Sequence, residues 1–160
     1  MTAEAPPQEI PLEAVIAEYG DMVYRLAFAQ VHSKSDADDI FQEVFLRYLK
    51  NHPQLKNADH CKAWLIRVTI NCSKKHWASA WQRKTIALED RYIFEQPEEN
   101  GLFEALTQLA PKYRSVIHLY YYEGYATAEI AQILGRREST VRTQLTRARD
   151  RLGQLLKGES

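Results

Sequence analysis

Long apolar runs, cysteine and net charge are all scarce in this 160-residue sequence. No stretch approaches the roughly 20 consecutive apolar residues that a transmembrane helix needs. The first residues, MTAEAPPQEIPLEA, are acidic and proline-rich, unlike a signal peptide. We therefore expect a cytoplasmic protein whose two cysteines stay reduced. The sequence also lacks the GxxxxGK(S/T) pattern of a nucleotide-binding loop and leaves no room for a large catalytic domain, so we expect neither a cofactor nor an enzymatic activity.

A metal site is the alternative role for the cysteines, because Cys72 and His76 are four residues apart and share one helix face. The other candidate ligands are His60 and Cys61. Cys61 precedes Cys72 by eleven residues, which is about 16 Å along a continuous helix. One zinc ion cannot bind both cysteines, so we expect no metal site and interpret the cysteines as small buried side chains.

The charges are balanced in number but not in position. Lysine plus arginine and aspartate plus glutamate each total 21, which argues against a general nucleic-acid coat protein. Residues 62–85 nevertheless contain six basic and no acidic residues, whereas residues 1–31 and 86–110 are acidic. A second basic stretch lies near the C-terminus. Two separate basic stretches suggest two contacts with one polyanion.

Residues 124–156 have the pattern of two helices joined by a tight turn. Thr127 is a suitable N-cap for the first helix, and Gly135 is the residue type expected where that helix ends. Ser139 then caps a second, longer helix. Apolar residues recur along it at spacings of four, three and four and should face the core: Val141, Leu145, Ala148 and Leu152.

The opposite face of this second helix carries hydrogen-bond donors. Arginine makes paired hydrogen bonds with guanine in the major groove of B-DNA, and arginines in the turn suit phosphate contacts. The alternative is an amphipathic hairpin whose arginines are merely solvated. The caps, turn and spacing together favour a DNA-binding helix-turn-helix. Its predicted DNA contacts are Arg136, Arg137, Ser139, Thr140, Arg142, Thr143 and Arg147.

The N-terminal part of the chain predicts amphipathic helices separated by a turn. Residues 12–31 have helical apolar periodicity, and Ser33–Asp36 is the predicted turn. The next helix, DADDIFQEVFLRYLK, starts with Asp36, Asp38 and Asp39, where the helix dipole favours anions. These carboxylates could alternatively serve a metal-dependent nuclease. A strip on this helix, either a docking site for a partner or simply solvated, contains Asp39, Gln42, Glu43 and Leu46.

A loop at Asn51–Cys61 precedes a further helix that we expect to begin near Lys62. Trp64 belongs to its apolar side and should lie in the core. The other side mixes cationic, amide and aromatic side chains, a combination that suits single-stranded nucleic acid. The residues on this side are Arg67, Asn71, Lys74, Lys75 and Trp77.

The segment 83–100 loses the helical periodicity, is acidic and contains Pro97, so we interpret it as a linker. A short helix to about Leu109 should follow, and then a helix that starts with Pro111 and ends at Gly124. The tyrosines at 120–122 face different directions on such a helix. At most one of them could stack on a base at any single site, so we expect packing in the core and against neighbouring helices.

In this order the motifs DDIFQEVFLR, AWLIRVTIN, an acidic linker and LYYYEGYATAEIAQILGRRESTVRTQLTRARDRL resemble the extracytoplasmic-function sigma factors of bacteria. The resemblance covers roughly residues 15–156. It implies an all-α protein of two small helical domains joined by a flexible linker. The implied bounds are 12–82 for sigma region two, 83–100 for the linker and 101–157 for sigma region four with its helix-turn-helix.

The resemblance also implies a division of functions. The strip of Asp39, Gln42, Glu43 and Leu46 would dock on core RNA polymerase. The loop before the third helix and Asn71 would capture a flipped base of the minus-10 element, while Arg67, Lys74 and Lys75 hold the separated strand. The helix that begins at Ser139 would recognise the minus-35 element of promoter DNA.

The implied function is therefore a promoter-specificity subunit for transcription initiation, often associated with stress response and held inactive by an anti-sigma factor. Its main rival is a repressor or activator that uses the same helix-turn-helix without polymerase. The polar strip at Asp39, Gln42 and Glu43 favours the sigma factor over this rival.

Overall fold

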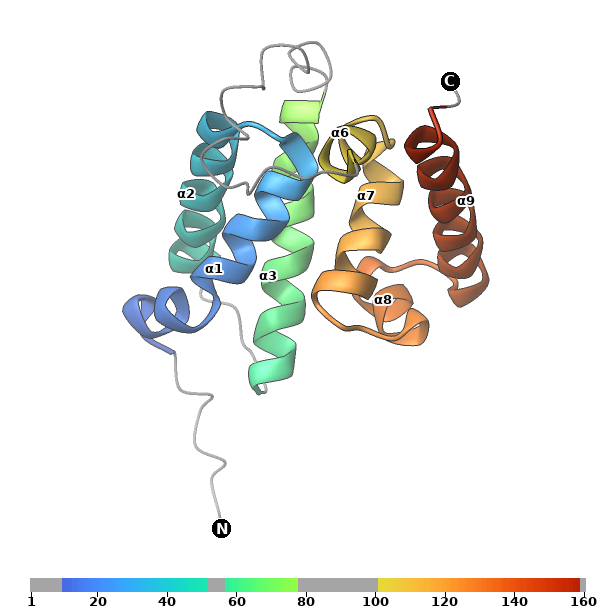
Figure 1. Cartoon of the computed structure of the whole chain (residues 1–160). Helices are drawn as coiled ribbons and strands as arrows, with labels where there is room; N and C mark the ends of the chain where they lie inside the picture. The colour runs from blue at the N-terminus through green and yellow to red at the C-terminus, as the bar shows by residue number, and fades with distance from the viewer. Residues whose placement is uncertain (1–9, 52–56, 78–100, 159–160) are drawn as a thin grey trace.

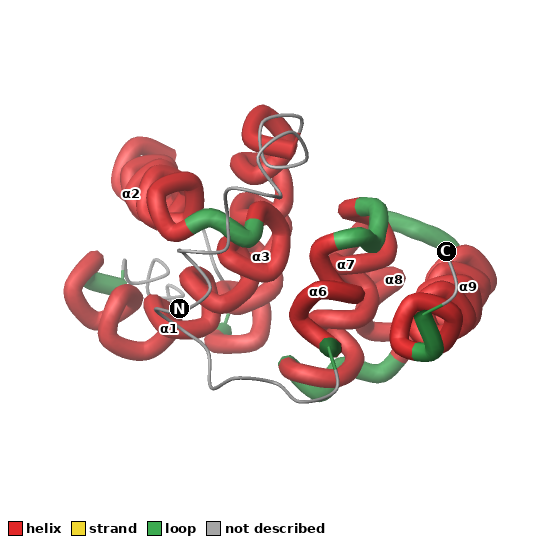
Figure 2. Tube along the Cα trace, turned by 45° about the horizontal axis from the view of Figure 1, so that its top comes forward, coloured by secondary structure: helices red, strands yellow, loops and turns green. Residues whose placement is uncertain are grey.

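The computed structural model describes residues 10–51, 57–77 and 101–158, and this described part of the chain is helical without a strand (Figures 1 and 2). The expected all-α fold is confirmed. The N-terminal half contains α1 (Leu12–Val31), α2 (Lys34–Asn51), α3 (Ala58–Ser73) and the 3₁₀ turn η1 (Lys74–His76). The C-terminal half contains α6 (Leu102–Thr107), α7 (Pro111–Ile117), the π-helical segment η2 (His118–Tyr122), α8 (Thr127–Leu134) and α9 (Glu138–Leu156).

The N-terminal half is a three-helix unit in which α1 packs against both α2 and α3. The bounds of α1 are those that its apolar periodicity predicts. The predicted turn at Ser33–Asp36 is wrong, because α2 begins at Lys34. Ser33 caps this helix: its hydroxyl accepts a hydrogen bond from the backbone N–H of Asp36 at 3.3 Å.

The third helix starts earlier than the predicted Lys62. Asn57 is its N-cap, and the side-chain oxygen of Asn57 accepts a hydrogen bond from the backbone N–H of His60 at 2.8 Å. This cap allows Ala58, Asp59 and His60 to be helical despite their low apolar content. The rest of the predicted loop, residues 52–56, lies outside the described part of the chain.

In the C-terminal half, α9 packs across α6, α7 and α8. Pro111 occupies the first turn of α7, as predicted. The expectation that the tyrosines at 120–122 are core residues is wrong for two of them, since Tyr121 and Tyr122 are 55% and 61% exposed. The π-helical turn at η2 shifts the register of this segment, which the sequence periodicity did not indicate.

The two halves lie against each other. In Figure 1, α3 stands between α2 and the C-terminal helices, and contacts join α1 to α7 and α3 to α8. The buried apolar residues of both halves form one cluster. The predicted linker at 83–100 falls within the undescribed residues 78–100, so the domain bounds stay predictions.

Candidate nucleic-acid interface

The helix-turn-helix is formed by α8 and α9. Gly135 ends α8 with φ 67°, in the left-handed region that favours glycine, and its backbone N–H donates to the carbonyl oxygen of Ala131. The backbone N–H of Arg136 donates to the same oxygen at 2.9 Å. The turn at Gly135 is therefore confirmed.

The caps of both helices differ from the prediction. Ala126, not Thr127, is the N-cap of α8, and its backbone N–H donates to Glu129 Oε1 at 2.9 Å. Thr127 is the first helical residue, and its hydroxyl donates to Glu138 Oε2 at 2.9 Å. Arg137 precedes α9 without a side-chain cap, so Ser139 lies in the first turn of α9 and is not the predicted cap.

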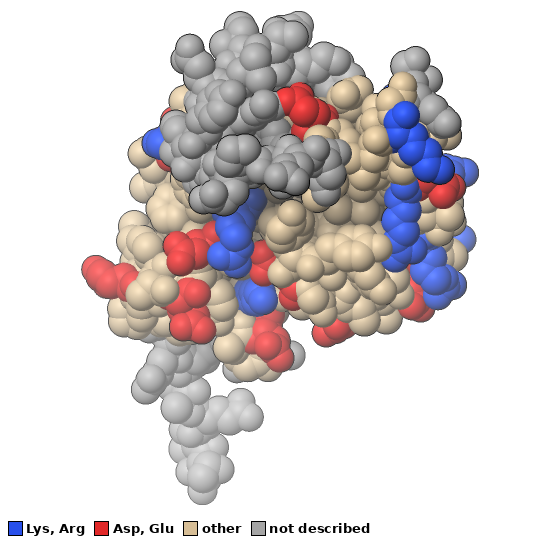
Figure 3. Space-filling model, in the orientation of Figure 1, with Lys and Arg blue, Asp and Glu red and all other residues tan. Residues whose placement is uncertain are grey.

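The two faces of α9 are as predicted. Val141, Leu145 and Ala148 are at most 2% exposed, and Leu152 packs at the edge of the same core. The predicted DNA contacts on the opposite side are exposed, and Lys and Arg side chains gather over α9 at the right-hand edge of Figure 3. The exposed candidates are Arg137, Ser139, Thr140, Arg142, Thr143 and Arg147.

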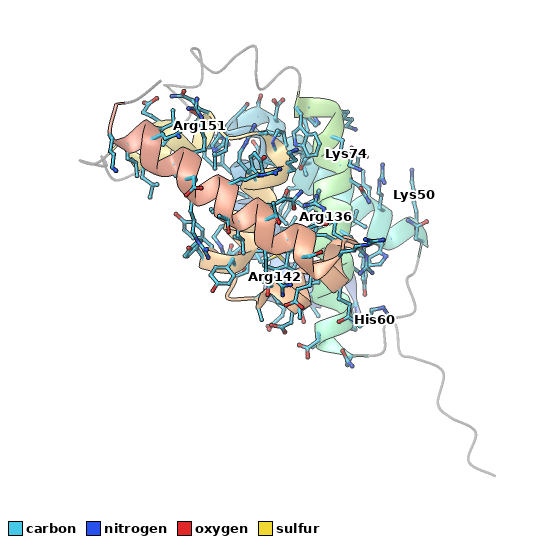
Figure 4. All side chains as sticks on the ribbon, turned by 90° about the vertical axis from the view of Figure 1, so that its right-hand side faces the viewer. Lys50, His60, Lys74, Arg136, Arg142 and Arg151 are labelled. Atoms are coloured by element: carbon cyan, nitrogen blue, oxygen red, sulfur yellow. The ribbon has the colours of Figure 1, made fainter. Side chains whose placement is uncertain are left out.

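Arg136 is the exception among the DNA-contact candidates. It is half-buried, its Nη1 donates to Gln144 Oε1 at 2.9 Å, and burial lowers its pKa. Figure 4 shows it beside Arg142 near the start of α9. Arg136 therefore supports the turn from within, and fewer of its donors are available to DNA.

Glu138 is a residue at this surface that the sequence reasoning missed. It is the first residue of α9, and its Oε2 lies 3.3 Å from Nη1 of Arg142 and accepts the bond from Thr127. An acidic residue at a helix start is favoured by the dipole, and the i, i+4 spacing to Arg142 was a signal that could have found it. Glu138 therefore places a carboxylate beside two of the groups at this surface, Thr127 and Arg142.

The second basic surface lies on α3 and η1. Asn71, Lys74 and Lys75 are exposed, and Arg67 is half-buried on the same helix face. Trp77, predicted to face this side, is half-buried and packs against the core. The cationic and amide groups are thus accessible, whereas the aromatic group is not freely available for stacking.

The predicted partner strip lies on α2. Asp39 and Gln42 are exposed, and Leu46 is 53% exposed. Glu43 is half-buried and forms ion pairs with Arg47, at 2.7 Å, and with Lys75. Burial raises the pKa of Glu43, but the hydrogen bonds from Lys75 and Arg47 lower this pKa by more. The net result is a pKa below the usual range of a glutamate. The ion pair between Glu43 and Lys75 joins the partner strip to the basic surface of α3 and η1.

The aspartates of the nuclease alternative have separate partners. Asp36 Oδ1 lies 3.3 Å from Nδ1 of His76. Asp38 accepts hydrogen bonds from Tyr24, at 2.9 Å, and from Lys34, at 3.0 Å. Asp39 faces solvent. Within the described residues these contacts fit structural roles for Asp36 and Asp38 better than a shared metal.

Two family models match the chain: Sigma-70 region 2 at residues 15–83 and Sigma-70, region 4 at residues 100–152. The chain is 31% identical over 148 residues to RNA polymerase sigma factor SigV of Bacillus subtilis, covering 86% of each. It is 30% identical over 146 residues to ECF RNA polymerase sigma factor SigL of Mycobacterium tuberculosis, covering 84% of this chain and 82% of SigL.

Two solved structures share the fold. One is the sigma factor RpoE in complex with the anti-sigma factor NepR from Bartonella quintana, with TM-score 0.68, 18% identity and coverage of 91% of this chain and 96% of RpoE. The other is CnrH in complex with the cytosolic domain of CnrY, with TM-score 0.65, 22% identity and coverage of 93% and 89%. Among the helices described for this chain, none is long and apolar enough to cross a membrane.

Proposed function

The chain belongs to the ECF RNA polymerase sigma factors of the sigma-70 family, and we propose that it directs core polymerase to promoters. In this proposal α9 recognises a minus-35 element and α3 opens a minus-10 element. Sigma factors are regulatory DNA-binding proteins of transcription initiation rather than enzymes. The observation that carries the finer proposal is the pair of exposed polar surfaces, one on each sigma region.

The minus-35 assignment rests on the exposed face of α9. Arg142 and Thr143 lie in its first turns, the part of a recognition helix that contacts base edges in the major groove. The exposed guanidinium of Arg142 can make paired hydrogen bonds with a guanine. Arg137 and Arg147, exposed on either side, suit the flanking phosphates.

The minus-10 assignment rests on the common face of Arg67, Asn71, Lys74 and Lys75. Flipping a base out of the duplex costs a few kcal/mol, so the separated strand must be held. The lysines can bind its phosphates, and the exposed amide of Asn71 can pair with the edge of an unstacked base. Figure 4 shows Lys74 on η1, which follows α3, away from the start of α9.

The partner assignments follow from the α2 strip and from the relatives. Asp39, Gln42 and the exposed Leu46 offer polar and apolar contacts on one helix face, which suits docking on core RNA polymerase. The similar structures of RpoE and CnrH contain the anti-sigma factor NepR and the cytosolic domain of CnrY, respectively. We include an anti-sigma factor among the partners of this chain.

Transcription from a genomic fragment pool tests the proposal. Core polymerase is incubated with the pool, with and without this protein, and RNA starts are sequenced. We expect discrete new starts that share two upstream elements. If the protein binds duplex DNA but produces no new starts, it acts as a regulator without polymerase, and the proposed function is wrong.

A further inference from the structure

A cavity with charged walls lies between α3 and α8. Contacts join these two helices, which lie side by side in Figure 1. The cavity has a volume of about 500 Å³, and sites for small molecules typically measure about 300–1,000 Å³. Its lining comes from α3, from the loop that precedes α8 and from α8 itself. The cavity is therefore large enough for a small organic molecule that touches both helices.

One end of the cavity is acidic. Asp59 lies in the first turn of α3 and Glu129 in the first turn of α8, so each helix contributes one carboxylate to the lining. Burial raises the pKa of Tyr125 to about 12, and the charges of Asp59 and Glu129 are among the further causes. Lys62 lies 5.1 Å from the ring centre of Tyr125, but its ion pair is with Glu123, and neither residue lines the cavity. The two lining carboxylates therefore lie near one phenol, at the same end.

The other end of the cavity is basic. Arg67 follows Asp59 by eight residues on α3, which is about 12 Å along the helix. The described part of the chain contains no hydrogen-bond or ion-pair partner for the Arg67 guanidinium. Between the two ends the lining is apolar, because Ala63 lies midway between Asp59 and Arg67 on α3, and Ile133 of α8 is 6% exposed. The cavity thus has an acidic end, an apolar middle and an unpaired cation at its far end.

These groups restrict the charge of a suitable ligand. The lining holds two carboxylates and one guanidinium, besides the imidazole of His60. An ammonium group has three donors and can bond to both carboxylates, whereas the planar guanidinium binds a carboxylate through two parallel hydrogen bonds. A dianionic phosphate would meet two carboxylates with one guanidinium to balance it, and a diamine would place its second ammonium against Arg67. The lining therefore favours a ligand with a cation at one end and a single negative charge at the other.

We propose that this cavity binds a small zwitterion whose ammonium and carboxylate lie at opposite ends of a chain. The ammonium contacts Asp59 and Glu129, and the carboxylate contacts Arg67. The chain between them packs on Ala63 and Ile133. Both ω-amino acids and short peptides have this chemistry. An α-amino acid such as alanine does not, because both of its charged groups are attached to one carbon.

A bound zwitterion would occupy the guanidinium of Arg67. In the proposed function the same guanidinium holds the separated strand of the minus-10 element, and while it is paired with a ligand carboxylate it is not available to a DNA phosphate. The ligand would therefore inhibit promoter opening. This inhibition rests on the proposed function, whereas the binding of the ligand does not.

Isothermal titration calorimetry of the full-length protein tests the site without polymerase or DNA. The probes are ε-aminocaproate and trialanine, and the controls are caproate, hexylamine and alanine. We expect the zwitterionic probes to bind and each control to bind at least about tenfold more weakly, the factor expected for losing one hydrogen bond to a charged group. Tighter binding of trialanine than of ε-aminocaproate would identify a peptide as the ligand, and the reverse order would identify an ω-amino acid.

Two lining variants test the two ends of the site separately. Arg67→Gln should weaken the binding of ε-aminocaproate about tenfold and leave that of hexylamine unchanged. Glu129→Gln should weaken it by a similar factor and leave the binding of caproate unchanged, and its amide oxygen can still accept the hydrogen bond from the backbone N–H of Ala126. Glu13→Gln is the matched control, because Glu13 is also an exposed carboxylate in the first turn of a helix but does not line the cavity. Its affinity for ε-aminocaproate should equal that of the wild type.

The proposal is overturned if neither zwitterion binds saturably, if the singly charged controls bind as tightly as the zwitterions, or if both lining variants bind like the wild type. The transcription assay then tests the inhibition. Saturating ε-aminocaproate should reduce the RNA starts produced with the wild type, and unchanged starts would refute the competition for Arg67. A protein that binds the zwitterion but starts no transcription without it would refute the proposed function and leave the site standing.

Discussion

Replacing Arg142 with alanine separates base recognition from simple attraction to phosphate. The side chain is 59% exposed and its described ion pair is with Glu138, at 3.3 Å. An exposed pair of this kind contributes about 0–1 kcal/mol to stability, so Arg142→Ala should leave the fold intact. A lost paired contact with a guanine costs about 1–3 kcal/mol, which is roughly 5- to 150-fold in affinity for the cognate promoter.

The assay is binding of holoenzyme to a cognate promoter and to variants with one base changed in the minus-35 element, at several salt concentrations. We expect Arg142→Ala to bind the cognate promoter more weakly and to lose discrimination at one base position. Arg149→Ala is the charge-matched control, because Arg149 lies on the same helix but donates to the hydroxyl of Tyr121 at 2.6 Å. Equal weakening on all sequences, with a salt slope reduced by about one, would show that Arg142 contacts only phosphate and would refute our assignment.

Three further predictions concern the core, the partner strip and the carboxylate of Glu123. Leu145→Ala should lower the free energy of unfolding by about 2–5 kcal/mol, measured by denaturant titration, because Leu145 is 2% exposed in the core under α9; an unchanged midpoint would contradict the packing. Gln42→Ala combined with Leu46→Ala should reduce co-elution with core polymerase while circular dichroism stays constant, and full retention would remove the strip from the interface. Burial raises the pKa of Glu123, but the hydrogen bond from His118 and the charges of His118, Arg25 and Lys62 lower it more, so folding favours the carboxylate. The stabilising effect of the Glu123 carboxylate is complete above the unfolded pKa of about 4.3, and it is lost as the pH falls through the lower pKa of the folded state. Glu123→Gln should therefore lose less stability than the wild type in that pH range, measured by acid unfolding. Identical pH profiles of the two proteins would contradict this.

Periodic features were predictable from the sequence. The bounds of α1, the buried stripe of α9 and the turn at Gly135 follow from apolar spacing and from the conformational freedom of glycine, which are local properties. The helix starts were less predictable. Thr127 was a plausible cap, but its hydroxyl bonds to Glu138 eleven residues away, and Glu129 satisfies the backbone of Ala126 instead.

The contacts between the two regions could not be predicted from the sequence pattern. Arg114 meets Gln30 across 84 positions, and no spacing rule joins residues so far apart. No local pattern distinguishes Arg114 and Glu123 from other charged residues, whose usual environment is solvent. Their burial depends on how region four docks on region two, which periodicity within one helix does not determine.

The ion pair between Glu43 and Lys75 changes how the two surfaces of region two are understood. Sequence reasoning assigned Glu43 to polymerase and Lys75 to DNA as independent contacts, but the structure pairs them, and Lys75 is 61% exposed. Solvent screens the Lys75 end of this pair, so a partner carboxylate or a DNA phosphate can displace Glu43 from Lys75. While the pair is formed, each side chain neutralises the other. Binding of polymerase at Glu43 would therefore release Lys75 for the separated strand. No such competing contact is described for Gln42 and Leu46. These two residues are therefore better suited to bind polymerase whether or not the pair between Glu43 and Lys75 is formed.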